Sequence, residues 1–397
     1  MKSLMVSSQP ENFNDNIILS DCLEFLKNVP SASIDLIYLD PPFFTQKKHN
    51  LKNKQGKEYS FIDCWDSREE YLSFLKTRLI EMHRVLKKNG NIFLHCDNNA
   101  SHHIRILLDD IFGDNNFKSE IIWSYKRWSN SKKNLLPGHQ VILFYSKNKS
   151  NTFNTIYTDY SPTTNIDQIL QERTRENGKA VYKRDSNGNI VTTVVKKGVP
   201  LSDVWGIPFL NPKAKERTGY PTQKPIELLK RIIEIGSNKN DVVLDPFCGS
   251  GTTLVAAKLM KRKYIGCDIN SDAVSLSLKR LNQPFMTESF LLKKGIKAYD
   301  VKTEYEKAIL EELNCTIVQR NKGIDGFIQD KKNNKLIAVK IQKKEENIQE
   351  AIKLLKMAAQ KKQCSQTILI AHSEIPKSYP DNMIILLGYD LQMKLKR

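Results

Sequence analysis

The chain has 397 residues, 40% hydrophobic and 9% aromatic, enough for one large α/β domain and a smaller one. No apolar run approaches the ~18 residues of a membrane span, and the N-terminus has no apolar signal-peptide core, so we expect a cytoplasmic protein without a membrane anchor. The formal net charge of +18 predicts a polyanionic partner. The seven cysteines lack CxxC spacing, which favours reduced thiols.

Basic residues are concentrated in the middle of the chain. Residues 118–218 contain 17 lysines and arginines and eight acidic residues, whereas residues 1–117 contain 14 and 16. A generally lysine-rich composition does not explain why the first block is slightly acidic. We therefore expect the middle segment to contact the polyanion.

The first predicted strand is Asn16–Leu19, and a helix-like segment, CLEFLKNVP, follows it. Asp21 lies between them, where an aspartate makes a good helix N-cap. A cap at the carboxyl end of a strand also faces the crevice in which open α/β sheets bind ligands. The capping role therefore leaves room for a second one.

The next strand ends in an unusual turn, SIDLIYLDPPF, at residues 33–43. Pro41 and Pro42 cannot continue a strand ladder or a helix, so they predict a rigid turn between Asp40 and Phe43. Standing alone, this tetrapeptide would be read as an ordinary strand-ending turn.

The elements up to residue 124 alternate between strands and helices, which indicates a parallel sheet. Residues 44–61, rich in lysine, are predicted to be a loop that orders on the polyanion. The elements expected after it are a helix at Arg68–Lys88 stopped by Asn89-Gly90, a strand at Asn91–His95, a helix at Ile104–Ile111 and a strand at Glu120–Ser124. A zinc site built from His95, Cys96, His102 and His103 is disfavoured, because adjacent histidines on a helix cannot both face one metal. We expect no metal.

Between residues 125 and 217 the regular pattern dissolves, except for a clear strand at Val141–Tyr145. Aromatic and basic side chains alternate at its start, a composition suited to phosphate and base contacts. The candidate nucleic-acid contacts are Lys126, Arg127, Trp128, Lys132 and Lys133. Order returns at residues 218–235, where Thr222 is predicted to cap a helix whose first turn holds Pro225.

The stretch Asp241–Asp268 reads DVVLDPFCGSGTTLVAAKLMKRKYIGCD. It predicts a strand, a glycine loop, a helix beginning at Thr252 and a second strand ending at Asp268, which is half of a nucleotide-binding sheet. Neither the GxGxxG spacing of a dinucleotide site nor a Walker lysine is present. A nucleoside-like cofactor remains, and a terminal acid such as Asp268 suits the two hydroxyls of a ribose.

DPFCGSGTT closely resembles the S-adenosylmethionine loop of the DNA amino-methyltransferases, which methylate adenine N6 or cytosine N4. DPPF resembles the catalytic motif of the same family, and the order catalytic turn, recognition region, cofactor loop resembles its β group. The resemblance covers residues 15–284 and implies a Rossmann-like α/β methyltransferase sheet, with target recognition at 125–217. It also implies these cofactor contacts: Asp21, Thr222, Lys224, Asp245, Pro246, Phe247, Gly249, Ser250, Gly251, Thr252 and Asp268.

Methyl transfer to an exocyclic amine needs its lone pair aimed at the methyl donor. The Asp40 carboxylate and the Pro41 carbonyl would each accept one amino hydrogen, while Phe43 would stack on a base flipped out of the duplex. In the family, Asp at the first motif position usually accompanies adenine and Ser accompanies cytosine, so adenine N6 is favoured over cytosine N4.

The implied partner is double-stranded DNA, and a cognate restriction endonuclease would be consistent with such an enzyme. Monomer and homodimer stay open. Alternatives from other classes are a nuclease or repair protein, a bifunctional methyltransferase–nuclease, and a DNA-binding regulator with a vestigial cofactor fold. The motifs DPPF and DPFCGSGTT are both intact, which argues against the regulator, because a vestigial site should have lost one of them.

Residues 300–397 are predicted to form a separate small α/β domain that resembles the restriction-endonuclease fold. Its expected helices are Ala308–Leu313 and Ile348–Ala359, and its expected strands follow the turn at Gly323 and cover Lys335–Ile341 and Thr367–Ala371. Asp325 matches the first metal-binding acid of such nucleases. With Lys340 as the lysine, the second ligand position is Ala338; with Lys340 at the second position, the lysine becomes Gln342. Either register lacks a part, so we expect a domain that binds DNA or a partner without cutting. A basic α/β module unrelated to nucleases is the alternative.

Overall fold

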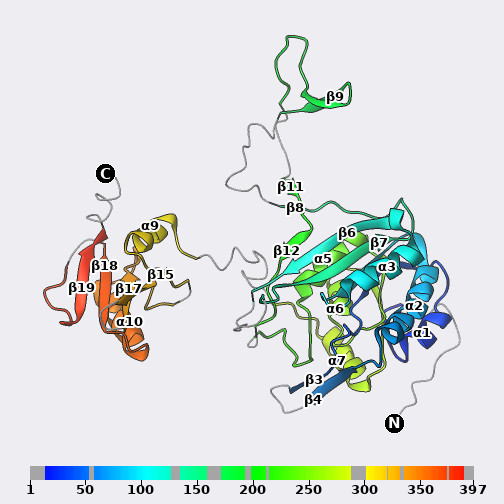
Figure 1. The fold of residues 1–397 in the computed structure, drawn as a ribbon, viewed down its shortest axis with the longest axis horizontal. Helices are drawn as coiled ribbons and strands as arrows, with labels where there is room; N and C mark the ends of the chain where they lie inside the picture. The colour runs from blue at the N-terminus through cyan, green and yellow to red at the C-terminus, as the bar shows by residue number, and fades with distance from the viewer. Residues whose placement is uncertain are drawn as a thin grey trace. The chain divides into compact units, whose positions relative to one another are not determined.

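The computed structural model describes residues 14–52, 58–126, 135–158, 171–192, 198–211, 214–287, 301–319, 321–330, 335–372 and 375–388. The chain divides into two compact units, residues 1–293 and residues 294–397 (Figure 1). None of the helices in the described ranges combines the length and the apolar character that a bilayer crossing needs.

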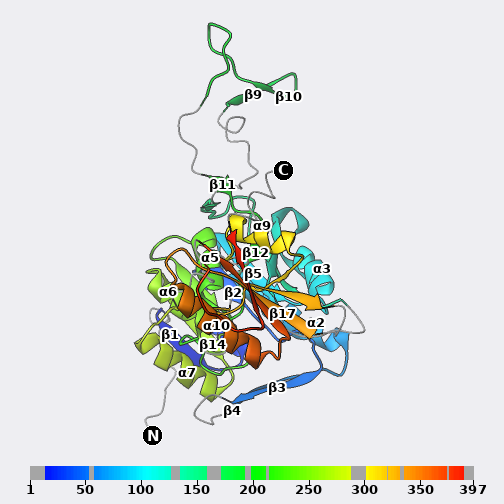
Figure 2. The ribbon, with the colours of Figure 1, turned by 90° about the vertical axis from the view of Figure 1, so that its left-hand side faces the viewer.

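The first unit is built on an eight-stranded sheet, seen from two directions in Figures 1 and 2. Its strands, in spatial order, are β1 (Asn16–Leu19), β14 (Lys263–Asp268), β13 (Val242–Asp245), β2 (Ile34–Leu39), β5 (Leu86–Cys96), β7 (His139–Ser146), β6 (Phe117–Ser124) and β12 (Val204–Gly206). The first five are parallel to one another. The carboxyl ends of these five strands therefore meet at one edge of the sheet.

β7 lies beyond the elements up to residue 124 for which a parallel sheet is predicted, and it runs antiparallel to both β5 and β6. β6 and β7 are consecutive in the chain and adjacent in the sheet, an arrangement that antiparallel pairing permits without a crossover helix. β7 contains the predicted strand Val141–Tyr145 and lies inside the segment 125–217. Part of that segment therefore belongs to the central sheet.

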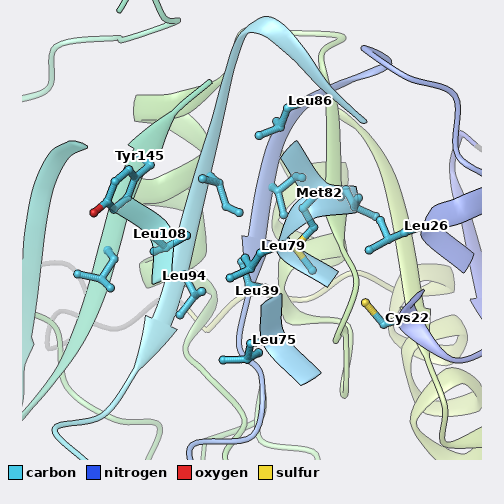
Figure 3. Close-up of a cluster of buried hydrophobic side chains, with 14 of the residues drawn as sticks. Cys22, Leu26, Leu39, Leu75, Leu79, Met82, Leu86, Leu94, Leu108 and Tyr145 are labelled. Atoms are coloured by element: carbon cyan, nitrogen blue, oxygen red, sulfur yellow. The ribbon is translucent and has the colours of Figure 1, made fainter. Parts of the chain in front are cut away.

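Helices cover both faces of this sheet. On one face lie α1 (Cys22–Asn28), α2 (Arg68–Val85) and α3 (Ser101–Phe112), followed by the short helix η2 (Asp114–Asn116); on the other lie α5 (Ile226–Gly236), α6 (Thr252–Leu259) and α7 (Ser271–Asn282). Successive side chains of β2 serve the two cores alternately: Ile37 and Leu39 pack with the first set of helices, Leu36 and Tyr38 with the second. Figure 3 shows Leu39 and Leu94 of the sheet beside Leu75, Leu79 and Met82 of α2. Two faces covered by helices explain why the central strands are apolar throughout.

Two local predictions are wrong. The helix expected to end at Asn89-Gly90 ends at Val85, because Leu86 pairs with Ile34 and draws the following residues into β5. The predicted loop 44–61 contains an antiparallel ribbon of β3 (Lys47–Lys52) and β4 (Glu58–Asp63). A two-stranded ribbon is joined by backbone hydrogen bonds, so it needs no apolar periodicity that a sequence would reveal.

Small ribbons occupy the region between β7 and β12. β8 (Tyr157–Thr158) pairs with β11 (Val199–Pro200), and β9 (Arg173–Glu176) pairs with β10 (Lys179–Tyr182), both antiparallel. Their side chains are mostly exposed, which explains why the sequence shows no regular hydrophobic pattern here.

The second unit is a five-stranded sheet with the order β15-β16-β17-β18-β19. Its elements are α9 (Glu304–Glu312), β15 (Thr316–Ile317), β16 (Gly326–Asp330), β17 (Lys335–Ile341), α10 (Ile348–Lys361), β18 (Gln366–Ala371) and β19 (Met383–Leu387). α9 packs with one apolar cluster and α10 with the other. The sequence pattern predicted α9, β16, β17, α10 and β18 but missed the strands β15 and β19.

Candidate active site at the carboxyl edge of the sheet

Four neighbouring parallel strands each end at an aspartate. Asp21 and Asp40 follow β1 and β2, and Asp245 and Asp268 are the last residues of β13 and β14. Because these strands are parallel, all four carboxylates gather at the same edge of the sheet. They line a single cavity of about 460 Å³.

This cavity unites the two sequence motifs. Its walls include Asp40–Phe43, Asp245–Ser250 and Thr252, together with Thr222 and Lys224. Gly251 is the one member of the predicted cofactor loop that does not line it. Two segments 200 residues apart in sequence therefore form one site, as a cofactor loop facing a catalytic turn requires.

Asp40 forms a buried ion pair through its Oδ2 with Nζ of Lys224. Among the described residues, no group hydrogen-bonds to its other oxygen, Oδ1, which is fully buried. Burial raises the pKa of the Asp40 carboxyl above its ordinary value, and the Lys224 ammonium opposes that rise. A buried acceptor without a partner, at the wall of a cavity, is suited to a donor supplied by a ligand.

His95 supports this side of the cavity from β5. Its Nδ1 lies 2.8 Å from the Tyr38 hydroxyl and 3.9 Å from Asp40 Oδ1, and its Nε2 lies 3.0 Å from Gln140 Oε1. Burial, with Lys224 nearby, holds the pKa of His95 well below its ordinary value, so the ring is neutral. The Phe43 ring lies 5.7 Å from it. Within the described ranges no cluster of three His, Cys, Asp or Glu side chains could hold a metal.

The glycine loop is held by the acid at the end of β14. Asp268 accepts hydrogen bonds from Gly249 N (2.8 Å) and Asn270 N (2.9 Å). Gly251 has a φ of 72°, and a Cβ there would lie 2.5 Å from Ser277 Oγ. Only glycine fits this turn, since both the backbone angle and the neighbouring helix α7 exclude a side chain.

Asp245 holds the other end of the same loop. Its Oδ1 accepts from Phe247 N (3.1 Å) and its Oδ2 from the Thr253 hydroxyl (2.5 Å). Burial raises the pKa of this carboxyl to about 7 despite these hydrogen bonds.

Asp21 caps α1 as predicted, accepting from Leu23 N (2.8 Å) and Glu24 N (3.3 Å). Its second oxygen pairs with Arg78 Nη2 of α2 at 2.7 Å. Burial acts to raise the pKa of Asp21, but the Arg78 guanidinium and the helix amides outweigh it and lower the pKa. The cap therefore stays ionised while it faces the cavity.

A family model described as DNA methylase matches residues 34–279. This chain belongs to the DNA methylase family. It is 34% identical over 278 residues to the DNA adenine methyltransferase YhdJ of Escherichia coli K12, covering 69% of this chain and 86% of that protein. It is 31% identical over 294 residues to the type II methyltransferase M.HinfI of Haemophilus influenzae, covering 69% and 70%. Among solved structures, PvuII DNA methyltransferase (cytosine-N4-specific) aligns with a TM-score of 0.45 at 17% identity, covering 71% of this chain and 89% of that one.

One capping prediction for this DNA methylase is wrong. Thr222 has a φ of 59°, and α5 begins at Ile226 with Pro225 at the cap position and no side-chain cap there. The first amide of the helix, Ile226 N, donates instead to Glu216 Oε1 at 2.9 Å. A distant glutamate replaces the local threonine because the left-handed turn at Thr222 directs the chain away from a capping geometry.

Two residues that support the methylase site carried no sequence signal: Glu216, which is buried, and Arg280, which is half-buried. Arg280 of α7 donates from Nη1 to Ser250 O (2.6 Å) and Thr252 Oγ1 (3.0 Å), so it supports the cofactor loop from behind. Burial lowers its pKa to about 10, and Glu216 opposes that shift. Both residues lie outside any motif, and their burial follows only from the packing of α7 and the segment before α5.

The predicted DNA contacts are only partly described. Lys126 is exposed just after β6, while Arg127, Trp128, Lys132 and Lys133 lie outside the described residues.

Proposed function

We propose that this methylase transfers a methyl group from S-adenosylmethionine to N6 of adenine in double-stranded DNA. One observation carries the proposal: Asp40, with its buried and unpaired Oδ1, lines the same cavity as the glycine loop. An acceptor for an amine hydrogen and a cradle for a nucleoside cofactor thus share one enclosed space.

The residues that would hold S-adenosylmethionine fit its chemistry. The glycine loop Gly249–Thr252 permits close approach of the backbone, and Asp268 at the end of β14 suits two ribose hydroxyls. Asp21 would contact the adenine ring. Lys224 would bind the methionine carboxylate, since it is a buried cation within reach of the cavity. The cofactor supplies an activated methyl group.

The catalytic turn would act on the target amine. Asp40 Oδ1 accepts one amino hydrogen and the Pro41 carbonyl the other, which draws the nitrogen toward a tetrahedral shape and orients its lone pair. Pro42 keeps the turn rigid, and Phe43 stacks on the flipped base. Asp40 performs this role only as a carboxylate, and Lys224 favours that charged form.

The choice of adenine over cytosine rests on Asp40 itself, since aspartate at the first motif position accompanies adenine in the resembling family. The adenine activity named for the E. coli relative agrees with it. We further propose that the methylase acts in a restriction–modification system, because type II methyltransferases are among its relatives. The basic middle segment would choose the DNA site.

The test is methyl transfer from labelled S-adenosylmethionine to unmethylated genomic DNA, followed by enzymatic digestion and chromatography of the nucleosides. Label in N6-methyladenine supports the proposal. Label in N4-methylcytosine would refute the adenine assignment, and no incorporation would refute the reaction.

For the second unit we propose a restriction-endonuclease-like fold that does not cut DNA. Asp325, the expected metal ligand, instead forms an ion pair with Lys302 and accepts from Ile341 N at 2.7 Å. Lys340 Nζ forms an ion pair with Glu346 Oε2 at 3.0 Å and donates a hydrogen bond to Lys322 O at 3.0 Å. Incubation of the full chain with plasmid DNA and Mg²⁺ or Mn²⁺ tests this; cleavage abolished by Asp325→Ala would refute it.

A further inference from the structure

We propose that Asp63, the last residue of β4, is a positioning residue that sets the conformation of the turn after the catalytic motif. The inference rests on the proposed function in one respect: that function makes this turn the binding site of the target base. Asp63 is 1% exposed and belongs to no motif. It lies 20 residues beyond Phe43, just after the segment 44–61 that the sequence pattern marks as a loop.

The Asp63 carboxylate accepts hydrogen bonds from five donors, four of which belong to residues 43–45. Its Oδ2 accepts from Phe43 N (3.1 Å), Thr45 N (2.9 Å) and the Thr45 hydroxyl (2.6 Å). Its Oδ1 accepts from Phe44 N (3.0 Å) and Trp65 Nε1 (3.0 Å). Three successive backbone amides that converge on one carboxylate form an anion-binding concavity, here filled by a side chain of the same protein.

The backbone of this turn adopts conformations that non-glycine residues disfavour. Phe44 has a φ of 60° and Gln46 a φ of 55°, both in the left-handed region. Such angles persist only where surrounding contacts over-determine them. Asp63 supplies those contacts at residues 43–45, and the Tyr71 hydroxyl adds one by donating to Pro42 O at 2.8 Å. Gln46 is held instead by two hydrogen bonds between its side chain and the Trp65 backbone, of 2.7 and 2.8 Å.

The same contacts locate the groups that would receive the base. The Phe43 amide donates a hydrogen bond to Asp63. The Phe43 ring packs near His95, and its centroid lies 5.3 Å from Lys224 Nζ. Asp40 is held separately, by Lys224. Removing the Asp63 charge should therefore displace Phe43 and the turn while it leaves the glycine loop, held by Asp268, in place.

The test compares Asp63→Asn with Asp35→Asn in the full chain. Asp35 is a matched control: it is also a buried carboxylate, at the start of β2, and accepts from Lys87 Nζ (2.8 Å) and Val242 N (2.9 Å) far from the catalytic edge. We expect Asp63→Asn to lower the single-turnover methylation rate about 10- to 100-fold at saturating substrates, with cofactor affinity within about twofold of wild type. Asp35→Asn should lower the melting temperature without that loss of rate.

Hydrogen exchange provides a readout independent of activity. In Asp63→Asn, the amides of Phe43, Phe44 and Thr45 should lose protection, while those of the glycine loop keep theirs. If Asp63→Asn does not fold, Trp65→Phe and Thr45→Val each remove one donor, and each should lower the rate with unchanged cofactor affinity.

Three results would overturn the inference: full protection and an unchanged rate in the variants, a cofactor affinity that falls as far as the rate, or an equal loss of rate in Asp35→Asn. The outcome is separable from the adenine assignment. A wild-type protein that methylates cytosine refutes that assignment and leaves the role of Asp63 intact. If the wild type methylates nothing, the hydrogen-exchange measurement by itself decides whether Asp63 holds the turn.

Discussion

Lys224 and Asp40 form a buried ion pair although 184 residues separate them in the chain. Lys224 comes from the turn before α5 and Asp40 from the end of β2, so the pair joins the segment before the glycine loop to the DPPF turn. It also means that the electrostatic state of the proposed catalytic carboxylate depends on a residue from a distant part of the chain.

Asp40→Ala should reduce methylation by at least about 100-fold, because an acceptor aimed at the target amine is lost. S-adenosylmethionine should still bind, measured by calorimetry. The substitution leaves the Lys224 ammonium buried without its partner, so it should also lower stability. The double variant Asp40→Ala/Lys224→Met should recover stability but not methylation; wild-type turnover in either variant would contradict the role of Asp40.

Lys224→Met should move the acid limb of the pH–rate profile to higher pH. Burial raises the pKa of Asp40 and Lys224 lowers it, so without the lysine the pKa rises further. The active carboxylate form then requires a higher pH, and activity is lost where the wild type is still active. The profile is measured at saturating S-adenosylmethionine, with Lys87→Met as the control for a lysine paired to a buried carboxylate elsewhere. An unmoved acid limb would contradict the coupling.

Asp268→Ala should weaken cofactor binding. Loss of a charged acceptor for two ribose hydroxyls costs about 1.5–3 kcal/mol, roughly a 10- to 150-fold rise in Kd. The loop amide of Gly249 loses its acceptor as well. Asp110→Ala, which changes an exposed acid on α3, should leave Kd unchanged. Unchanged affinity in Asp268→Ala would place the ribose elsewhere.

Gly251→Ala should destabilise the protein and weaken cofactor binding together, because a Cβ would meet Ser277 Oγ at 2.5 Å. Gly178 is the matched control, since it also has a positive φ, of 78°, but nothing lies within 4 Å of its Cβ position. Gly178→Ala should cost only the left-handed strain, about 1–2 kcal/mol, and leave cofactor affinity intact. Melting temperatures and calorimetry distinguish the two effects; equal losses would remove the steric argument.

Exchange of residues 147–203 for the same region of a relative should change which DNA sites are methylated and preserve the chemistry. These boundaries differ from the predicted region 125–217, because β7 and β12 belong to the central sheet. Exchange of all of 125–217 should instead abolish folding. Sequencing of the methylated sites gives the answer, and an unchanged pattern in an active 147–203 chimera would contradict it.

The sequence by itself determined the two motifs and the strands that carry them. β2, β13 and β14 are short apolar runs that end at an acid, and such runs are readable because burial on both faces requires apolar residues throughout. The cofactor loop is equally local, since a glycine such as Gly251 is dictated by its own backbone angle. The cap at Asp21 follows from neighbours in sequence.

Only the tertiary structure decided how the segments meet. β7 lies between β5 and β6 because of strand pairing, which leaves no local trace, and the helix before β5 ends early because Leu86 pairs with Ile34. The residues that hold the site, Asp63, Glu216 and Arg280, act across long stretches of chain. A sequence does not distinguish an aspartate or arginine on the surface from one that is buried against a loop. Burial and partners distinguish them, and both arise only when distant elements pack together.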